Sequence, residues 1–215
     1  MWYGMWKYDL LGESSRFSSV SESIKEIFTT NNHGLYLLEL PTESYCEMNF
    51  CTIKHLIDNG FKGVYVSFQR PLENIDSMLK ELEIDNSQIK ILDGTNETKN
   101  NKNKGELLPK DVNKIFDKIL YSLENLEGNK KFVFIDSITT MALINSEPWS
   151  DKFSKYLVTL KDQVNFEDIV FIVNSPKDLS NKKIVKNISS SADMVLNISF
   201  IKGYSVEVIK QNILT

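Results

Sequence analysis

Residues 132–137 read FVFIDS, and this short stretch decides the fold class. Four apolar residues in succession, all aromatic or β-branched, are typical of a strand that is buried on both faces, as in a parallel sheet. Asp136 and Ser137 then supply two short polar side chains, which favour a turn or a helix cap where the strand ends. A strand buried in this way requires neighbouring strands, and similar apolar runs occur on both sides of it along the chain.

These apolar runs alternate along the chain with segments whose apolar residues recur at helical spacing. The runs predict strands at residues 35–38, 63–68, 89–92, 132–135 and 169–173. The periodic segments predict helices at residues 19–30, 50–58, 71–82, 109–126 and 149–164. Two last runs, 194–198 and 204–209, predict a closing hairpin that turns at Lys202 and Gly203. The sequence therefore predicts an α/β fold, in which a mostly parallel sheet is flanked by helices and ends in a C-terminal antiparallel hairpin.

The length of 215 residues and the hydrophobic content of 41% suit one domain with a core of ordinary size, so we expect a single domain over residues 1–215. Residues 1–13 form a predicted N-terminal aromatic arm, which we expect to pack across a sheet edge; the alternative is an exposed element that docks onto a partner. Its large aromatic residues are Trp2, Tyr3, Trp6 and Tyr8. Residues 94–108 predict a flexible polar loop, because a segment rich in Asn and Lys cannot bury enough apolar surface to fold by itself.

Net charge and cysteine content limit the classes of function. The formal net charge of −4 provides no general attraction to nucleic acid. Cys46 and Cys51 are the two cysteines, and no His/Cys pair has the spacing of a zinc site, so we expect no metal. Two cysteines without a disulfide framework, together with no apolar run long enough to cross a bilayer, predict a cytoplasmic protein without a membrane partner.

Several of these segments together resemble the RecA-like ATPase superfamily, and within it the KaiC-like branch of archaea and bacteria. GVYVSF at residues 63–68 is similar to the second strand of that family, and FVFIDS is similar to its Walker B strand. ADMV at residues 192–195 and VEVIK at residues 206–210 resemble its terminal strands, the last of which commonly ends in a lysine. The resemblance covers roughly residues 14 to 211 and implies a RecA-like P-loop NTPase fold.

The same resemblance implies that the nucleotide-binding residues have been lost. A P-loop needs two glycines that let the backbone wrap phosphate, a lysine for its charge, and Ser or Thr for magnesium. In this chain those positions fall within residues 38–50, LELPTESYCEMNF, and in that order on Leu40, Tyr45, Cys46 and Glu47. Gln69 stands where the family commonly has a catalytic glutamate, and an amide cannot accept a proton from water.

The replacements also oppose phosphate binding on physical grounds. Tyr45 places a bulky side chain, and a demanding backbone angle, where the loop must turn tightly. Glu47 brings its own negative charge to the start of the helix, the place where an anion would otherwise bind, and Glu43 adds a second negative charge. We therefore expect no nucleotide cofactor at this junction.

Asp136 keeps the Walker B position. It could hold magnesium through water, or it could be a strand-end residue that caps the following turn or helix, and the loss of the lysine and Ser/Thr favours the cap. Ser137 and Thr139 are likewise expected to be turn and capping residues. His33 and His55 lie outside any nucleophile motif and are expected on the surface.

The resemblance and the lost residues together predict a non-catalytic RecA/KaiC-like protein. We expect a pseudo-ATPase that acts as a regulatory or scaffold subunit through protein–protein contacts. Domains of the family assemble side by side with the nucleotide between neighbours, so the resemblance implies a homo-oligomer, or a hetero-oligomer with an active paralogue.

Two other functions are compatible with the sequence. One is a divergent ATP-binding protein or ATPase with an unconventional site built from Asp136, Arg70 and Lys210. The other is a nucleic-acid-binding module, against which the acidic net charge argues. Its contacts would come from the lysines of residues 99–110 and from Lys182, Lys183 and Lys186.

Overall fold

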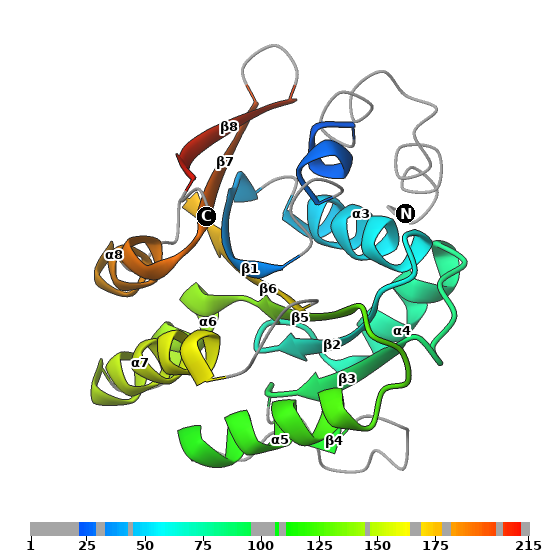
Figure 1. Ribbon diagram of the computed structural model, residues 1–215, viewed down its shortest axis with the longest axis horizontal. Helices are drawn as coiled ribbons and strands as arrows, with labels where there is room; N and C mark the ends of the chain where they lie inside the picture. Colours follow the sequence, from blue (N-terminus) through cyan, green and yellow to red (C-terminus); the bar gives the residue numbers. More distant parts are fainter. Residues whose placement is uncertain are drawn as a thin grey trace.

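The computed structural model describes residues 22–28, 33–42, 45–95, 106–107, 111–144, 147–163, 169–177, 182–200 and 204–211. Within this part of the chain, eight strands form one sheet in the order β4-β3-β2-β5-β6-β1-β7-β8 (Figure 1). The strands are β1 (Gly34–Leu40), β2 (Lys62–Ser67), β3 (Ile89–Asp93), β4 (Glu106–Leu107), β5 (Lys131–Asp136), β6 (Ile169–Pro176), β7 (Met194–Phe200) and β8 (Tyr204–Gln211). All neighbouring strands are parallel except β7 and β8, which pair antiparallel. The predicted α/β class, with its mostly parallel sheet and C-terminal hairpin, is confirmed.

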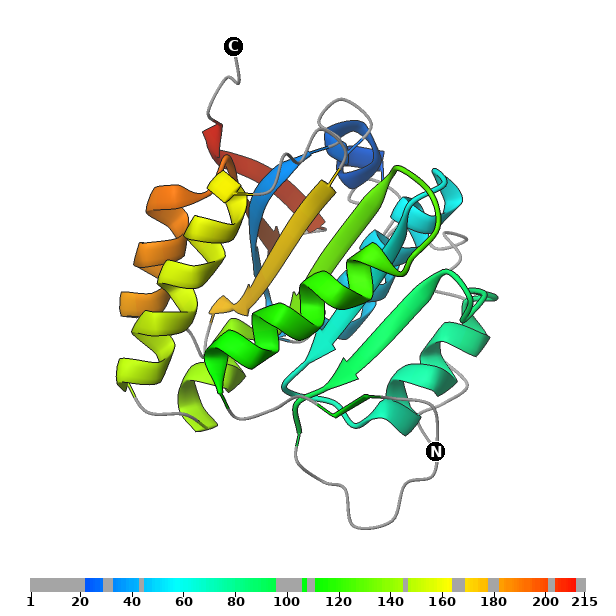
Figure 2. The ribbon, with the colours of Figure 1, turned by 60° about the horizontal axis from the view of Figure 1, so that its bottom comes forward.

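Helices cover both faces of this sheet (Figures 1 and 2). The helices are α3 (Tyr45–Asp58), α4 (Leu72–Glu81), α5 (Val112–Glu124), α6 (Ile138–Ile144), α7 (Glu147–Gln163) and α8 (Lys182–Ser191), and residues 22–28 are also helical. One face packs against residues 22–28, α3 and α4, and the other face packs against α5, α6, α7 and α8. Among the described residues, no helix is long and apolar enough to cross a membrane.

The two cores explain why the strand segments are continuously apolar. Successive residues of a strand point to opposite faces, so each strand supplies both cores in turn. In β5, Phe132 and Phe134 pack on the α3 side while Val133 and Ile135 pack on the α5 side, and all four are fully buried. Asp136 continues this alternation and therefore points to the α3 side, beyond Phe134 at the carboxyl end of the strand.

Three elements were not predicted. α8 was missed because only Ile184 and Ile188, four residues apart, mark its buried face in a polar stretch. α6 was missed because it is a single short helix directly after β5, where the sequence indicated a turn. β4, Glu106 and Leu107, lies inside residues 94–108, the segment predicted to be a flexible polar loop. A strand of two residues leaves no periodic pattern, and it exists because it pairs with Leu92 and Asp93.

The helix after β1 begins five residues earlier than predicted. α3 starts at Tyr45, inside the stretch that resembled a turn, because Tyr45 and Met48 already lie on its buried face at helical spacing. Most of the polar loop, the N-terminal arm of residues 1–13 and the turn at Lys202 and Gly203 lie outside the described residues. The prediction of a single domain over residues 1–215 stays a prediction.

Candidate functional site

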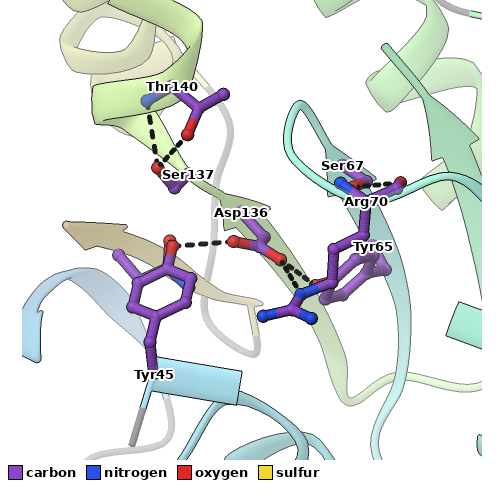
Figure 3. Close-up of polar contacts among 8 residues, drawn as sticks. Tyr45, Tyr65, Ser67, Arg70, Asp136, Ser137 and Thr140 are labelled. Carbon is purple, nitrogen blue, oxygen red and sulfur yellow. Dashed lines mark hydrogen bonds and ion pairs between the residues drawn. The ribbon is translucent and has the colours of Figure 1, made fainter. Parts of the chain in front are cut away.

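The candidate site lies where the carboxyl ends of β2, β5 and β6 approach the first turn of α3 (Figure 3). Parallel strands end at the same edge of a sheet, and ligands of open α/β sheets bind at that edge. β5 lies between β2 and β6, so Asp136 at its end is central. Its neighbours come from all three directions: Tyr65 from β2, Asn174 from β6 and Tyr45 from α3.

The Asp136 carboxylate is fully buried, and both of its oxygens have partners (Figure 3). The Tyr45 hydroxyl donates a hydrogen bond to Oδ1 at 2.7 Å. The Tyr65 hydroxyl donates to Oδ2. Arg70 Nε lies 3.7 Å from Oδ2, which is too long for a hydrogen bond but close enough for ionic attraction. A buried carboxylate requires such partners, because without them its desolvation would cost several kcal/mol.

Tyr45 reaches this carboxylate because α3 begins at that residue. Its side chain is only 3% exposed, so the whole ring is enclosed beneath the first turn of the helix. The hydroxyl also forms a hydrogen bond with the side-chain amide of Asn174. One tyrosine thus connects the N-terminus of α3 to the ends of both β5 and β6.

The ionisation of the cluster follows from its burial. Desolvation raises the pKa of the Asp136 carboxyl, while the hydrogen bonds from Tyr65 and Tyr45 and the charge of Arg70 act in the opposite direction. Desolvation, followed by the nearby Asp136 charge, raises the pKa of Tyr45 and of Tyr65 well above the ordinary value. Both tyrosines therefore remain protonated at neutral pH and act as hydrogen-bond donors.

A tight turn after β2 positions Arg70. Ser67 Oγ accepts a hydrogen bond from the Arg70 backbone N–H at 2.9 Å and donates one to the Arg70 carbonyl at 2.7 Å. Gln69, which was predicted to replace a catalytic glutamate, is exposed in this turn, whereas the Arg70 side chain is 23% exposed and lies next to Asp136. The turn thus directs a cation, rather than a carboxylate or amide, towards the centre of the site.

The other predicted positions are dispersed around this centre. Leu40 is the last residue of β1, where it is buried in the core on the α3 side. Cys46 and Glu47 follow Tyr45 in the first turn of α3, and their side chains are outside the described part of the chain. The structure therefore brings together Tyr45, Asp136 and Arg70, and leaves Leu40 and Gln69 out of the cluster.

The predicted capping role of Asp136 is wrong. Ser137 supplies the cap instead, because its Oγ accepts a hydrogen bond from the Thr140 backbone N–H at 3.1 Å. This contact confirms the prediction for Ser137. Thr139 is not a cap: it lies within α6, is buried, and shares a hydrogen bond of 2.9 Å with the Ser175 hydroxyl of β6.

The prediction of surface histidines is also wrong for His55. His55 is 9% exposed on α3, and its ring nitrogens lie 3.2 Å from the side-chain nitrogen of Asn59. Burial, with a smaller effect of the Lys25 charge, lowers the pKa of His55. His33 is half-buried, and its carbonyl accepts a hydrogen bond from the Tyr36 hydroxyl at 2.9 Å.

Sequence reasoning missed two members of the cluster, Tyr65 and Asn174. Asn174 stands directly after the apolar run of β6, just as Asp136 stands directly after the apolar run of β5. A polar residue at the end of a buried strand was therefore the feature that could have identified Asn174. Tyr65 gave no such signal, since it resembles an ordinary aromatic residue in a buried strand. Its hydroxyl reaches Asp136 only because β2 lies beside β5, where the pairing register places Tyr65 opposite Phe134.

This set of residues is a poor fit to a magnesium-bound nucleotide. Mg²⁺ requires six oxygen ligands in an octahedral arrangement, whereas both Asp136 oxygens already face a hydroxyl or the guanidinium of Arg70. The positive charge of Arg70 would repel a second cation at this position. Across the described ranges, no group of three or more His, Cys, Asp or Glu side chains could hold a metal ion.

Comparison with known proteins identifies the fold. No family model and no curated protein matches this sequence. Three solved structures from Pyrococcus horikoshii are similar to it. The KaiC-like protein PH0186 has 18% identity and a TM-score of 0.59, with 84% of this chain and 80% of that chain covered. PH0321, solved in complex with an unknown peptide, has 14% identity and a TM-score of 0.66, with 86% and 89% covered. PH0250 has 11% identity and a TM-score of 0.63, with 87% and 92% covered. The chain therefore has the RecA-like fold found in KaiC-like proteins, as the sequence predicted.

Proposed function

We propose that this chain is a non-catalytic RecA-like protein, a pseudo-ATPase whose nucleotide site is closed by its own side chains. It acts as a scaffold or regulatory subunit through contacts with other proteins, as a homo-oligomer or beside an active paralogue. The observation that carries this proposal is the enclosure of Asp136 by Tyr45, Tyr65 and Arg70.

The enclosure makes nucleotide entry unfavourable. A ligand that displaced Tyr45 would expose a buried aromatic ring, which costs roughly 1.5–3 kcal/mol. It would also break a hydrogen bond to a buried carboxylate, which costs roughly another 1.5–3 kcal/mol. Together these costs weaken binding on the order of 100-fold to 10,000-fold.

The alternative ATP site built from Asp136, Arg70 and Lys210 is not favoured. Arg70 lies beside Asp136, but Lys210 belongs to β8, and β6, β1 and β7 lie between β8 and β5. At about 4.8 Å between neighbouring strands, the backbones of β5 and β8 are roughly 19 Å apart. The three residues therefore do not converge within one chain.

Another protein with a similar fold has been solved with a peptide bound. PH0321 was solved with an unknown peptide bound, so that protein binds a polypeptide segment. At 14% identity this similarity shows a shared fold and nothing about shared binding surfaces. The contact surface of this chain depends on its own residues.

Calorimetric titration with ATP and Mg²⁺ tests the closed site. We expect no binding tighter than about 1 mM, which corresponds to about 4 kcal/mol. A matched variant, Tyr45→Gly with Cys46→Lys and Glu47→Thr, restores three of the four P-loop positions and should gain affinity. Tyr45→Phe is the control, because it keeps the ring in place. Magnesium-dependent binding by the unaltered protein at micromolar affinity would overturn the proposal.

Light scattering after size exclusion tests the scaffold role. A mass of two or more chains is expected for a homo-oligomer. A mass of one chain would mean that the partner is a protein of different sequence. The Tyr45→Phe variant should have the same mass as the unaltered protein, because its substitution lies inside the closed site.

A further inference from the structure

The outer surface of α7 and α8 carries an excess of positive charge. The two helices lie side by side (Figures 1 and 2), and Lys183 of α8 forms an ion pair with Asp151 of α7 at 3.0 Å. α8, with the sequence KKIVKNISSS, contains no acidic residue. The whole chain has 29 acidic and 25 basic residues, so the charge of this surface is opposite to that of the protein that carries it.

Four described lysines form this surface, which we call the basic face. They are Lys152 and Lys155 of α7 and Lys183 and Lys186 of α8, and all four are exposed. Residues three apart lie on the same side of a helix, about 5 Å from each other along its axis. The axes of packed helices are about 8–10 Å apart. Both distances are within about one Debye length at physiological ionic strength, so the positive potentials of the four lysines add together.

Asp151 neutralises one of these four charges, because it pairs with Lys183. The ammonium of Lys152 lies over the ring of Tyr156, 5.8 Å from its centre. Within the described residues, no carboxylate pairs with Lys152, Lys155 or Lys186. Three ammonium groups of the basic face can therefore pair with the carboxylates of a partner.

The fold by itself gives no reason for this arrangement. Like charges three residues apart on a helix repel each other and destabilise it. Lys183 also lies in the first turn of α8, where the helix dipole disfavours a positive charge. An ordinary exposed helix carries both signs of charge, as α3 does with the ion pair of Lys54 and Asp58 at 3.0 Å. Residues that oppose local stability in this way are expected where a surface binds a partner.

The composition of the basic face favours a short acidic protein segment over nucleic acid. A long polyanion would also approach the rest of the chain, whose formal net charge of −4 would repel it. α7 and α8 contain no arginine, and Tyr156 is half-buried, so the face lacks the planar groups on which bases stack. The hydroxyls of Thr159 and Ser190 donate to carbonyls of their own helices at 2.9 Å and 2.8 Å. The face is therefore suited to recognise negative charge rather than base edges.

We propose that the basic face of α7 and α8 binds a short segment of a partner protein that is rich in Asp or Glu. The segment lies across the two helices, and its carboxylates pair with Lys152, Lys155 and Lys186. This assigns a partner chemistry to the scaffold role, and so rests on that role, but it does not depend on closure of the nucleotide site. The ATP titration and the mass measurement do not involve the basic face, so the two proposals can fail separately.

Fluorescence anisotropy with a labelled 12-residue peptide that carries six glutamates tests the inference. The whole protein should bind this peptide in about 50 mM salt and release it as the salt concentration rises. A peptide with glutamine in place of every glutamate should not bind. Lys152→Gln with Lys155→Gln and Lys186→Gln should weaken binding at least about tenfold, and this variant keeps the ion pair of Lys183 and Asp151 between the helices.

The matched control removes the same amount of charge from other parts of the surface. It is Lys80→Gln with Lys114→Gln and Lys130→Gln, three exposed lysines outside α7 and α8. Its affinity for the peptide should change less than about twofold, because the effect of a charge fades beyond a Debye length. Equal weakening by both triple variants would mean that only the net charge matters, and would overturn the proposal.

Carbodiimide cross-linking shows where the peptide binds, because it joins a carboxylate directly to a neighbouring ammonium group. Mass spectrometry should find the links on the lysines of α7 and α8. Failure of the whole protein to bind the peptide, or links mainly on lysines outside these helices, would overturn the proposal. Tighter binding of a dT strand with six phosphates than of the acidic peptide would assign the face to nucleic acid and overturn it too.

Discussion

Removing the Tyr45 hydroxyl should destabilise the protein by about 2 kcal/mol. The hydroxyl is buried, donates to the Asp136 carboxylate at 2.7 Å and also bonds to Asn174. Hydrogen bonds to charged groups contribute about 1.5–3 kcal/mol, and Tyr45→Phe removes this one while the ring stays in place. Tyr65 and Arg70 still contact the carboxylate, so the loss stays well below the full cost of an unpaired buried charge.

Urea unfolding at pH 8, followed by tryptophan fluorescence, measures this loss. The midpoint should fall with an unchanged m value, and the melting temperature should fall by about 4–8 °C for a chain of this length. Tyr121→Phe is the control, because Tyr121 is 60% exposed and should stay within about 0.5 kcal/mol of the native protein. If Tyr45→Phe also stays within that range, the hydroxyl does not hold Asp136 as described, and the closed-site proposal loses its main support.

Other substitutions test the remaining parts of the structure. Folding raises the pKa of Asp136, so the folded state favours the protonated form of this carboxyl. The unfolding free energy should therefore decrease as the pH rises from the ordinary carboxyl pKa to the raised value. Urea titrations at several pH values measure this slope, and Asp136→Asn should remove it. Gly63→Ala should cost about 1–3 kcal/mol in the same assay, because the added Cβ would overlap the Phe132 ring, and a neutral result would contradict the packing of β2 on β5. Asp111→Ala should cost about 1 kcal/mol, because its carboxylate accepts hydrogen bonds from two backbone N–H groups in the first turn of α5, while Asp111→Asn should retain most of the stability.

Some residues of the candidate site could be predicted from the sequence, but their contacts could not. Asp136 could be found because a polar residue stands directly after a buried strand, and Tyr45 because it replaces a glycine in the motif that the chain resembles. Their direct contact could not be found, because they are 91 positions apart and only the packing of α3 against β5 joins them. Arg70 was named from the sequence only as part of an alternative ATP site with Asp136 and Lys210, and its position beside Asp136 depends on the turn that Ser67 closes.

The sequence by itself determined the class of fold, the identity of most helices and strands, and the absence of the glycines and lysine of a P-loop. These properties are local, since the spacing of apolar residues records which faces are buried. Only the tertiary structure decided that Tyr65 and Asn174 join Asp136, and that Thr139 is buried against β6. Each of these depends on which strands lie side by side, and strand order is fixed by long-range packing rather than by any short stretch of the chain.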